Sequence, residues 1–171
     1  AGAVPNTIAD DPNPYHETQF SNDFTYGRWT MSTLLDWRNG GLVSNMTNNL
    51  WDEGGNSRDF DKTSPEDGVA LGDFRYGSFA GGNISPYIEA GTFVKLREIN
   101  VSFQAPTKWA QLARARDLRM SFQARNLGMK TSYWSFDPEF NNFGNSNFNR
   151  FIDLAPYPSN RQFFFSLDLG Y

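Results

Sequence analysis

The last segment of the chain, residues 161–171, alternates between apolar and polar side chains. A period of two residues predicts a β-strand, because successive side chains of a strand point to opposite faces of the sheet. An apolar face that ends in an aromatic residue is typical of the closing strand of an outer-membrane β-barrel, where it contacts lipid. A strand of a soluble sandwich, with the same face covering a core, would show the same alternation. The predicted lipid- or partner-facing positions are Phe163, Phe165, Leu167, Leu169 and Tyr171.

Four further segments alternate with the same period, at residues 19–26, 29–37, 93–103 and 118–126. Each strand is roughly 9–11 residues long, which is the length that crosses a bilayer at the tilt of a barrel strand. We therefore predict an all-β chain that forms a single barrel segment over residues 1–171. It would contain about five antiparallel, up-and-down strands.

The connections between these strands alternate between short and long. Residues 27–28 and 104–117 make the shorter links, whereas residues 38–92 and 127–160 make long ones. Bacterial barrels have brief periplasmic turns and extended extracellular loops. The pattern therefore predicts long loops on one side of the sheet and places Tyr171 at the periplasmic rim.

Two connections contain good helix formers, and we expect short helices at residues 108–116 and near residues 44–53. The connection over residues 38–92 is also locally acidic. We interpret it as a solvated loop, because a run of like charges is usually hydrated. Its acidic residues are Asp59, Asp61, Glu66, Asp67 and Asp73.

The composition fits a membrane wall built from strands. Hydrophobic residues make up 39% of the chain and the mean hydropathy is −0.59, so no segment approaches the apolar run of a membrane-spanning helix. Aromatic residues are nonetheless abundant, with 16 Phe, 7 Tyr and 5 Trp. Barrel strands combine these properties because every second residue faces water or the lumen, although a soluble sandwich can show the same average.

Charge and chemistry exclude several classes of function. The net charge of −4 and the pI near 4.9 argue against a nucleic-acid partner, because phosphate binding requires clustered Lys and Arg. The chain has no cysteine, His16 is its single histidine, and no G-x-S-x-G nucleophile motif occurs. We therefore predict no catalytic residues, no metal ligands and no cofactor, and we expect the chain not to be an enzyme.

The Asn- and Phe-rich stretch at residues 136–150 allows a calcium interpretation, because Asp137, Glu139 and Asn141 supply oxygen ligands at every second position. The EF-hand pattern nevertheless fails, since Asn142 stands where glycine is needed and Phe148 where the closing Glu would be. Calcium is thus the weakest interpretation of this stretch.

A second interpretation of the same stretch is sugar binding, with aromatic rings stacking on the ligand and Asn amides donating hydrogen bonds. The alternative is an ordered extracellular loop whose Asn side chains bond its own backbone. Trp37 and Trp51 flank the other long connection and would line a substrate path, or else belong to an interfacial girdle or to loop packing. The candidate ligand or partner contacts are Trp37, Trp51, Trp134, Phe136 and Phe143.

Seven sequence blocks, in order along the chain, carry a resemblance to a known family. The chain resembles the C-terminal end of a SusC/RagA-type TonB-dependent outer-membrane transporter. Each block is weak alone, and their order over nearly the whole chain makes the set specific. The blocks are residues 11–14, 20–26, 35–41, 91–103, 118–126, 137–139 and 156–161.

The resemblance implies a large barrel with an N-terminal plug and a TonB box, which takes up oligosaccharides or peptides under a lipoprotein lid. The expected partners are the remainder of the barrel and, through the missing part, the TonB system and the lid lipoprotein. The chain departs from this plan because it has neither plug nor TonB box. Five strands also cannot close a barrel, which needs about eight, and large transporters have around 22.

Two hypotheses follow. In the first, the chain is the C-terminal wall segment of a SusC-like nutrient transporter in the bacterial outer membrane. In the second, a barrel end is reused as a stand-alone exported β-sheet subunit. Such a subunit would lie in the periplasm and dock on a larger membrane protein assembly through its aromatic face. No signal peptide is evident, and the start at Ala1 resembles either a processed terminus or the edge of a piece of a longer protein.

Overall fold

The computed structural model describes residues 11–139 and 151–171. Contacts between residues divide the chain into two compact units. The sheet unit consists of Glu17–Arg38, Phe93–Thr131 and Ser159–Tyr171. The loop unit consists of Ala1–His16, Asn39–Thr92 and Ser132–Pro158.

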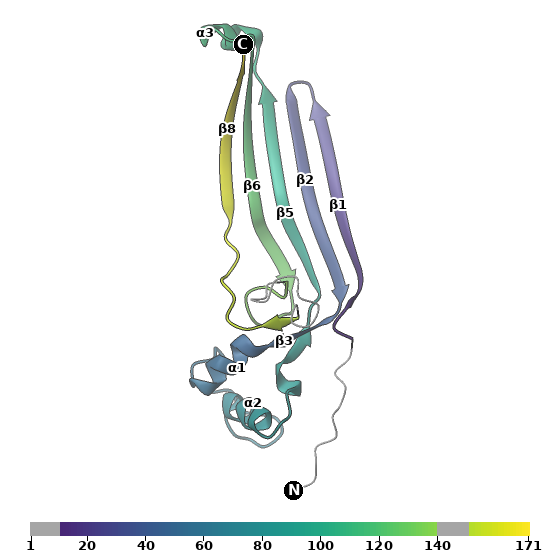
Figure 1. Cartoon of the computed structure of the whole chain (residues 1–171), viewed down its shortest axis with the longest axis vertical. Helices are drawn as coiled ribbons and strands as arrows, with labels where there is room; N and C mark the ends of the chain where they lie inside the picture. Colours follow the sequence, from purple (N-terminus) through teal and green to yellow (C-terminus); the bar gives the residue numbers. More distant parts are fainter. Residues whose placement is uncertain (1–10, 140–150) are drawn as a thin grey trace. The chain divides into compact units, whose positions relative to one another are not determined.

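Five strands form one antiparallel sheet in the order β1-β2-β5-β6-β8 (Figure 1). The expectation of an all-β fold with about five antiparallel strands is thereby confirmed. Each strand matches one of the alternating segments; β1, β2 and β6 extend several residues beyond the predicted ends and β5 extends by one. The bounds are β1 (Pro14–Tyr26), β2 (Trp29–Gly40), β5 (Phe93–Gln104), β6 (Asp117–Thr131) and β8 (Gln162–Gly170).

The register of the sheet gives it one apolar and one polar face, because directly opposed residues of antiparallel strands share a face. On the apolar face, Phe122 of β6 lies opposite both Val101 of β5 and Phe165 of β8. On the polar face, Ser121 lies opposite Ser102 and Ser166. The alternation read from the sequence thus extends coherently across neighbouring strands.

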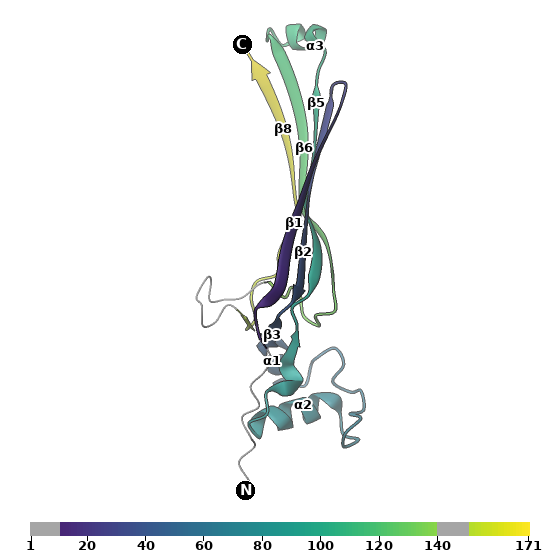
Figure 2. The same ribbon diagram turned by 90° about the vertical axis from the view of Figure 1, so that its right-hand side faces the viewer.

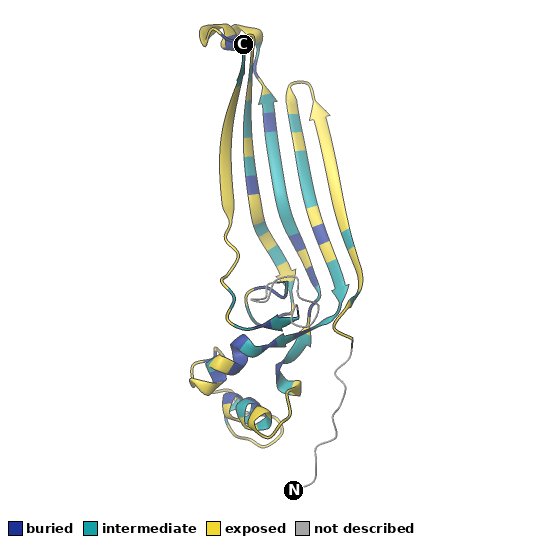
Figure 3. Cartoon of the chain, viewed as in Figure 1, coloured by how far each residue is buried: buried dark blue, intermediate teal, exposed yellow. Residues whose placement is uncertain are grey.

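The apolar face of the sheet is open. In β8, Phe163, Phe165 and Leu167 are 60%, 70% and 54% exposed. Most of β1 and β8, the two outer strands, is exposed along its length (Figure 3). Seen nearly edge-on, the five strands form a single twisted layer (Figure 2). A soluble sandwich core over this face is therefore not what the described chain forms.

One end of the sheet carries the short links. Gly27, with φ of 59°, forms the tight turn between β1 and β2, a backbone conformation that glycine adopts without strain. Helix α3 (Thr107–Leu112) connects β5 to β6; it begins one residue before the predicted range of 108–116 and overlaps its first half. It ends early because Arg114 takes a left-handed conformation, with φ of 56°.

The loop unit has a fold of its own. A three-stranded sheet in the order β4-β3-β7 lies beside helix α1 (Met46–Glu53), which matches the helix expected near residues 44–53. Helix α2 (Leu71–Ala80) and the 3-10 helix η1 (Ser85–Tyr87) have no counterpart in the sequence prediction. None of the helices in residues 11–139 and 151–171 is long and apolar enough to cross a membrane. The small strands are β3 (Leu42–Asn45), β4 (Ile88–Ala90) and β7 (Ile152–Asp153).

Candidate functional site

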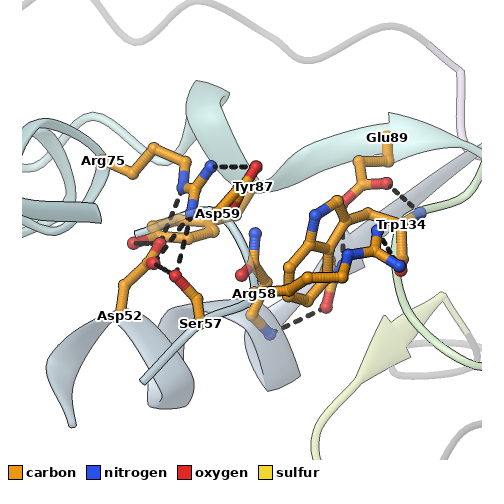
Figure 4. A network of polar contacts seen from close by, with 10 residues as sticks. Asp52, Ser57, Arg58, Asp59, Arg75, Tyr87, Glu89 and Trp134 are labelled. Carbon is orange, nitrogen blue, oxygen red and sulfur yellow. Dashed lines mark hydrogen bonds and ion pairs between the residues drawn. The ribbon is translucent and has the colours of Figure 1, made fainter. Parts of the chain in front are cut away.

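The loop unit is held together by a buried charge network centred on Arg75 of α2. Its guanidinium Nε lies 2.7 Å from Asp52 Oδ2 and its Nη2 lies 2.9 Å from Asp59 Oδ1 (Figure 4). Tyr87 donates its hydroxyl proton to Asp52 Oδ2 at 3.0 Å, and the Ser57 hydroxyl donates to the same carboxylate. The arrangement ties α1, α2 and η1 to one point.

The charges of this network stabilise one another. Burial by itself lowers the pKa of Arg75, but the hydrogen bonds and charges of Asp52 and Asp59 outweigh burial and raise that pKa. Burial raises the pKa of Asp59, and the hydrogen bond and charge of Arg75 reverse the shift, so the net pKa is lowered. The pKa of Tyr87 is raised, first by its burial and then by the nearby Asp52 carboxylate. Arg75 is therefore a cation held between two carboxylates.

The expectation that residues 38–92 form a solvated loop is wrong. The segment folds into α1, α2, η1 and two short strands, and Asp59 is partly buried in its ion pair with Arg75. The remaining acidic side chains of the run are exposed, as expected for hydrated charges. Charge density along the sequence missed the ion pair because Asp59 and Arg75 are 16 residues apart in the chain.

A pocket of about 450 Å³ lies beside this network in the loop unit. Three of the predicted aromatic residues meet in its wall: the ring of Trp51 lies 5.4 Å from that of Trp134 and 5.9 Å from that of Phe136, measured between centroids. Trp51 belongs to α1, whereas the other two rings follow β6 in sequence. The full lining is Trp51, Asn56, Arg58, Trp134, Ser135 and Phe136.

Trp134 is fixed by contacts to both its side chain and its backbone. The Arg58 guanidinium lies over its ring, 4.7 Å from the centroid, and Arg58 Nη2 lies 3.5 Å from the Trp134 carbonyl oxygen (Figure 4). The Trp134 backbone N–H donates to Glu89 Oε2 at 2.7 Å. Glu89 Oε1 in turn accepts a hydrogen bond from Asn45 at 2.7 Å. A fixed aromatic plane with a cation stacked on it is the result.

The other predicted contacts lie elsewhere. Trp37 is a residue of β2 in the sheet unit, and Phe143 lies outside the described residues, as do Asn141, Asn142 and Phe148 of the calcium interpretation. Asp137 accepts the backbone N–H of Glu139 at 2.9 Å, which closes a local turn. Within residues 11–139 and 151–171, no group of three or more acidic or histidine side chains is arranged to hold a metal ion.

Sequence reasoning found the aromatic residues of the pocket and missed its polar ones. These polar residues, Asn56, Arg58 and Ser135, belong to no recognised motif, although each immediately neighbours a residue of the charge network or of the aromatic set. The one available signal was that Ser135 lies between Trp134 and Phe136. The role of the aromatic residues as ligand contacts stays a prediction.

On the polar face of the large sheet, arginine and carboxylate side chains of neighbouring strands form ion pairs. Arg125 Nε of β6 lies 3.1 Å from Glu98 Oε2 of β5, and Arg97 Nε lies 2.7 Å from Asp36 Oδ2 of β2. Arg119 donates to Ser102 Oγ at 2.9 Å. Charged side chains that pair on one face, opposite an exposed apolar face, are what a water-filled lumen and a lipid exterior require of a barrel wall.

The five strands thus form a single antiparallel layer with one apolar and one polar face. Comparison of solved structures gives the particular fold: the chain is similar to RagA, the SusC-type TonB-dependent transporter of the RagAB peptide importer. No family profile matches the sequence, and no curated protein does.

Three RagAB structures illustrate the likeness. Against the "closed-closed" state the TM-score is 0.70 with 19% sequence identity, and against the "open-open" state it is 0.64 with 17% identity. A further structure of the RagAB peptide transporter gives 0.68 with 18% identity. The matches cover 95%, 96% and 95% of this chain, in that order, and 18% of the other chain in each case. The chain therefore spans less than a fifth of the length of these relatives in fold.

Proposed function

We propose that this chain is the C-terminal wall segment of a TonB-dependent, SusC-like transporter that takes up nutrients through the bacterial outer membrane. The observation that carries the proposal is the two-faced single-layer sheet, whose exposed apolar side is backed by a polar side with paired charges. Lipid on one side and a wet lumen on the other account for both faces at once.

The dimensions of the apolar face support this proposal. Along β2, the step from Trp29 to Trp37 spans roughly 27 Å of strand, or about 20 Å of barrel height at a tilt near 40°. The apolar band of outer-membrane barrels is about 25 Å tall. This stretch of β2 alone thus accounts for most of the height of such a band.

The short-link end of the sheet has the character of a membrane interface. The ring centroid of Phe103 lies 4.6 Å from that of Trp29 and 6.0 Å from that of Trp109 in α3. Tyr26 and Tyr171 belong to the same end and are 88% and 79% exposed. Aromatic girdles of this kind mark both edges of a barrel's apolar band. We assign this end to the periplasm and the two long connections to the extracellular side.

To close a barrel, the two outer strands of the sheet would have to pair with further strands. β1 and β8 end the sheet, and the remainder of a barrel would pair with their free edges. The plug, the TonB system and a lid lipoprotein would act through that remainder. The RagAB structures are described as those of a peptide importer, and for this chain we infer the wider class of nutrient uptake.

Paired cysteine substitutions test the proposal, because the chain has no cysteine of its own. Phe122→Cys places a nitroxide spin label on the apolar face and Gln123→Cys places one on the polar face. In outer membranes, the first label is expected to collide readily with oxygen and poorly with a water-soluble nickel chelate, and the second to show the reverse. Asp67→Cys, in the exposed part of the loop unit, is the water-accessible control.

The same labels address the stand-alone subunit. If the apolar face docks on a protein, the label at Phe122→Cys is immobilised and shielded from both reagents. If the face is simply in water, both labels collide with the nickel chelate. Either result overturns the assignment of this face to lipid.

A further inference from the structure

The aromatic pocket of the loop unit carries an unmatched cation, and we propose that it binds an acidic pyranoside, a sugar ring that bears a carboxylate. The inference rests on the proposed function only for its place in nutrient uptake. All six lining residues belong to the loop unit, so the binding itself does not depend on where the large sheet lies.

Arg58 is the group that requires a negative charge in the ligand. Its side chain is exposed, and among the described residues it forms no ion pair with any carboxylate. Asp59, the next residue in the chain, bonds to Arg75 instead. Stacking on Trp134 holds the guanidinium flat, and its N–H groups remain in a fork that suits a bidentate carboxylate.

The aromatic walls call for a flat, weakly polar surface next to that carboxylate. Four side chains form a continuous row, Arg58, Trp134, Trp51 and Phe136. The Arg58 guanidinium lies 4.7 Å from the Trp134 ring centroid, and the successive ring centroids are 5.4 and 5.9 Å apart. Phe136 at the end of the row is 53% exposed, so its ring is open to a ligand. The C–H face of a pyranose ring fits such a row, and the volume lies within the range of about 300–1,000 Å³ typical of small-molecule sites.

Two further polar groups in the lining call for hydroxyl partners. Ser135 Oγ is buried and has no hydrogen-bond partner in the described part of the chain, which is uncommon for a buried hydroxyl. The amide of Asn56 is exposed at the pocket, while its backbone N–H donates to the Trp51 carbonyl oxygen at 2.9 Å and so fixes its position. A simple aliphatic acid would satisfy Arg58 and leave these groups unpaired. A sugar acid supplies both the carboxylate and the hydroxyls.

Calorimetry on the purified full-length protein tests the proposal with a matched pair of probes, methyl glucuronide and methyl glucoside, which differ by the carboxylate. We expect the glucuronide to bind at least tenfold more tightly. Arg58→Gln should remove that preference, so that the two glycosides bind with similar affinity, because the contact that distinguishes the carboxylate is lost. Phe136→Ala should weaken both ligands, because both use the apolar wall.

Arg28→Gln is the control for Arg58→Gln. It removes the same charge from an exposed arginine in the β1–β2 turn, so it should leave both affinities unaltered. Equal affinity for the two glycosides, no binding of either, or an unchanged preference in Arg58→Gln would overturn the proposal. Tighter binding of a short acidic peptide than of the glucuronide would overturn it as well. These results leave the spin-label test of the large sheet untouched, so the two proposals fail separately.

Discussion

Arg75 is the central cation of the charge network in the loop unit, because it pairs with Asp52 and Asp59 at once. The side chain of Asp52 is fully buried and that of Asp59 is 13% exposed. Removing the guanidinium leaves two carboxylates with little water to replace it. A buried charge that loses its partner typically destabilises a protein by about 3–5 kcal/mol.

We therefore predict that Arg75→Met opens the loop unit. Hydrogen exchange of the amides in α1 and α2 is expected to accelerate by an amount equivalent to about 3–5 kcal/mol, whereas exchange in β5 and β6 changes little. Arg58→Met is the matched control, since that guanidinium is exposed and its loss should cost less than about 1 kcal/mol. Equal acceleration in the two variants would contradict the role given to the network.

For individual residues, the sequence identified candidate side chains but did not predict which side chains contact one another. Trp51, Trp134 and Phe136 were identified because large aromatic rings in loops are informative by themselves. The pairing of Arg75 with Asp52 was not predictable, because it depends on how α1 and α2 meet across 23 residues of chain. The polar lining of the pocket was missed for the same reason: Asn56 and Arg58 become informative only once Trp134 is brought beside them.

Among the secondary-structure elements, helix α2 could not be predicted from the sequence, because its composition is unfavourable for a helix. Gly72 and Gly77 lower its helix propensity, and its apolar residues do not repeat with a clear helical period. The helix forms nonetheless because it packs closely against the Phe60 ring at Gly72. A Cβ added at Gly72 would lie only 2.0 Å from Cδ2 of that ring, so glycine is what permits this close approach. Around Gly77 no atom lies within 4 Å of such a Cβ.

These two glycines give opposite predictions within one helix. Gly77→Ala should stabilise α2 by about 0.5–1 kcal/mol, because alanine is the better helix former and meets no obstacle. Gly72→Ala should destabilise it, because the new methyl group forces the Phe60 ring aside, at a typical cost of about 1–3 kcal/mol for an overpacked site. Amide exchange in α2 measures both. If both variants shift exchange in the same direction, the packing of α2 on Phe60 is wrong.

The strands of the large sheet were predictable because their signal is local. Period-two alternation located all five, and the ends were missed where the backbone departs from regular pairing. In β6 the predicted strand stops at Asn126, which adopts φ of 54° at an irregularity in the pairing with β5, and the strand then continues to Thr131. A bulge shifts the face of every later residue, so the alternation breaks although the strand does not.

For the whole molecule, the two faces of the sheet predict a place in a larger wall. A free-standing five-stranded layer would expose large aromatic side chains on one face and two unpaired edges, both of which favour association. Under the proposed function, pairing of β1 and β8 with further strands would remove the edges, and lipid would cover the apolar face. The chain covers 18% of the length of the RagAB chains it resembles, which fits a segment of such a wall.

The most direct test of this central claim is the intact mass and location of the natural protein. An antibody raised against this chain would be used on separated outer-membrane and periplasmic fractions of the native cells, followed by mass measurement of the captured species. We predict a species several times heavier than 19.4 kDa in the detergent-extracted outer membrane. A species of about 19.4 kDa in the periplasmic or peripheral fraction would contradict the claim and favour the stand-alone subunit.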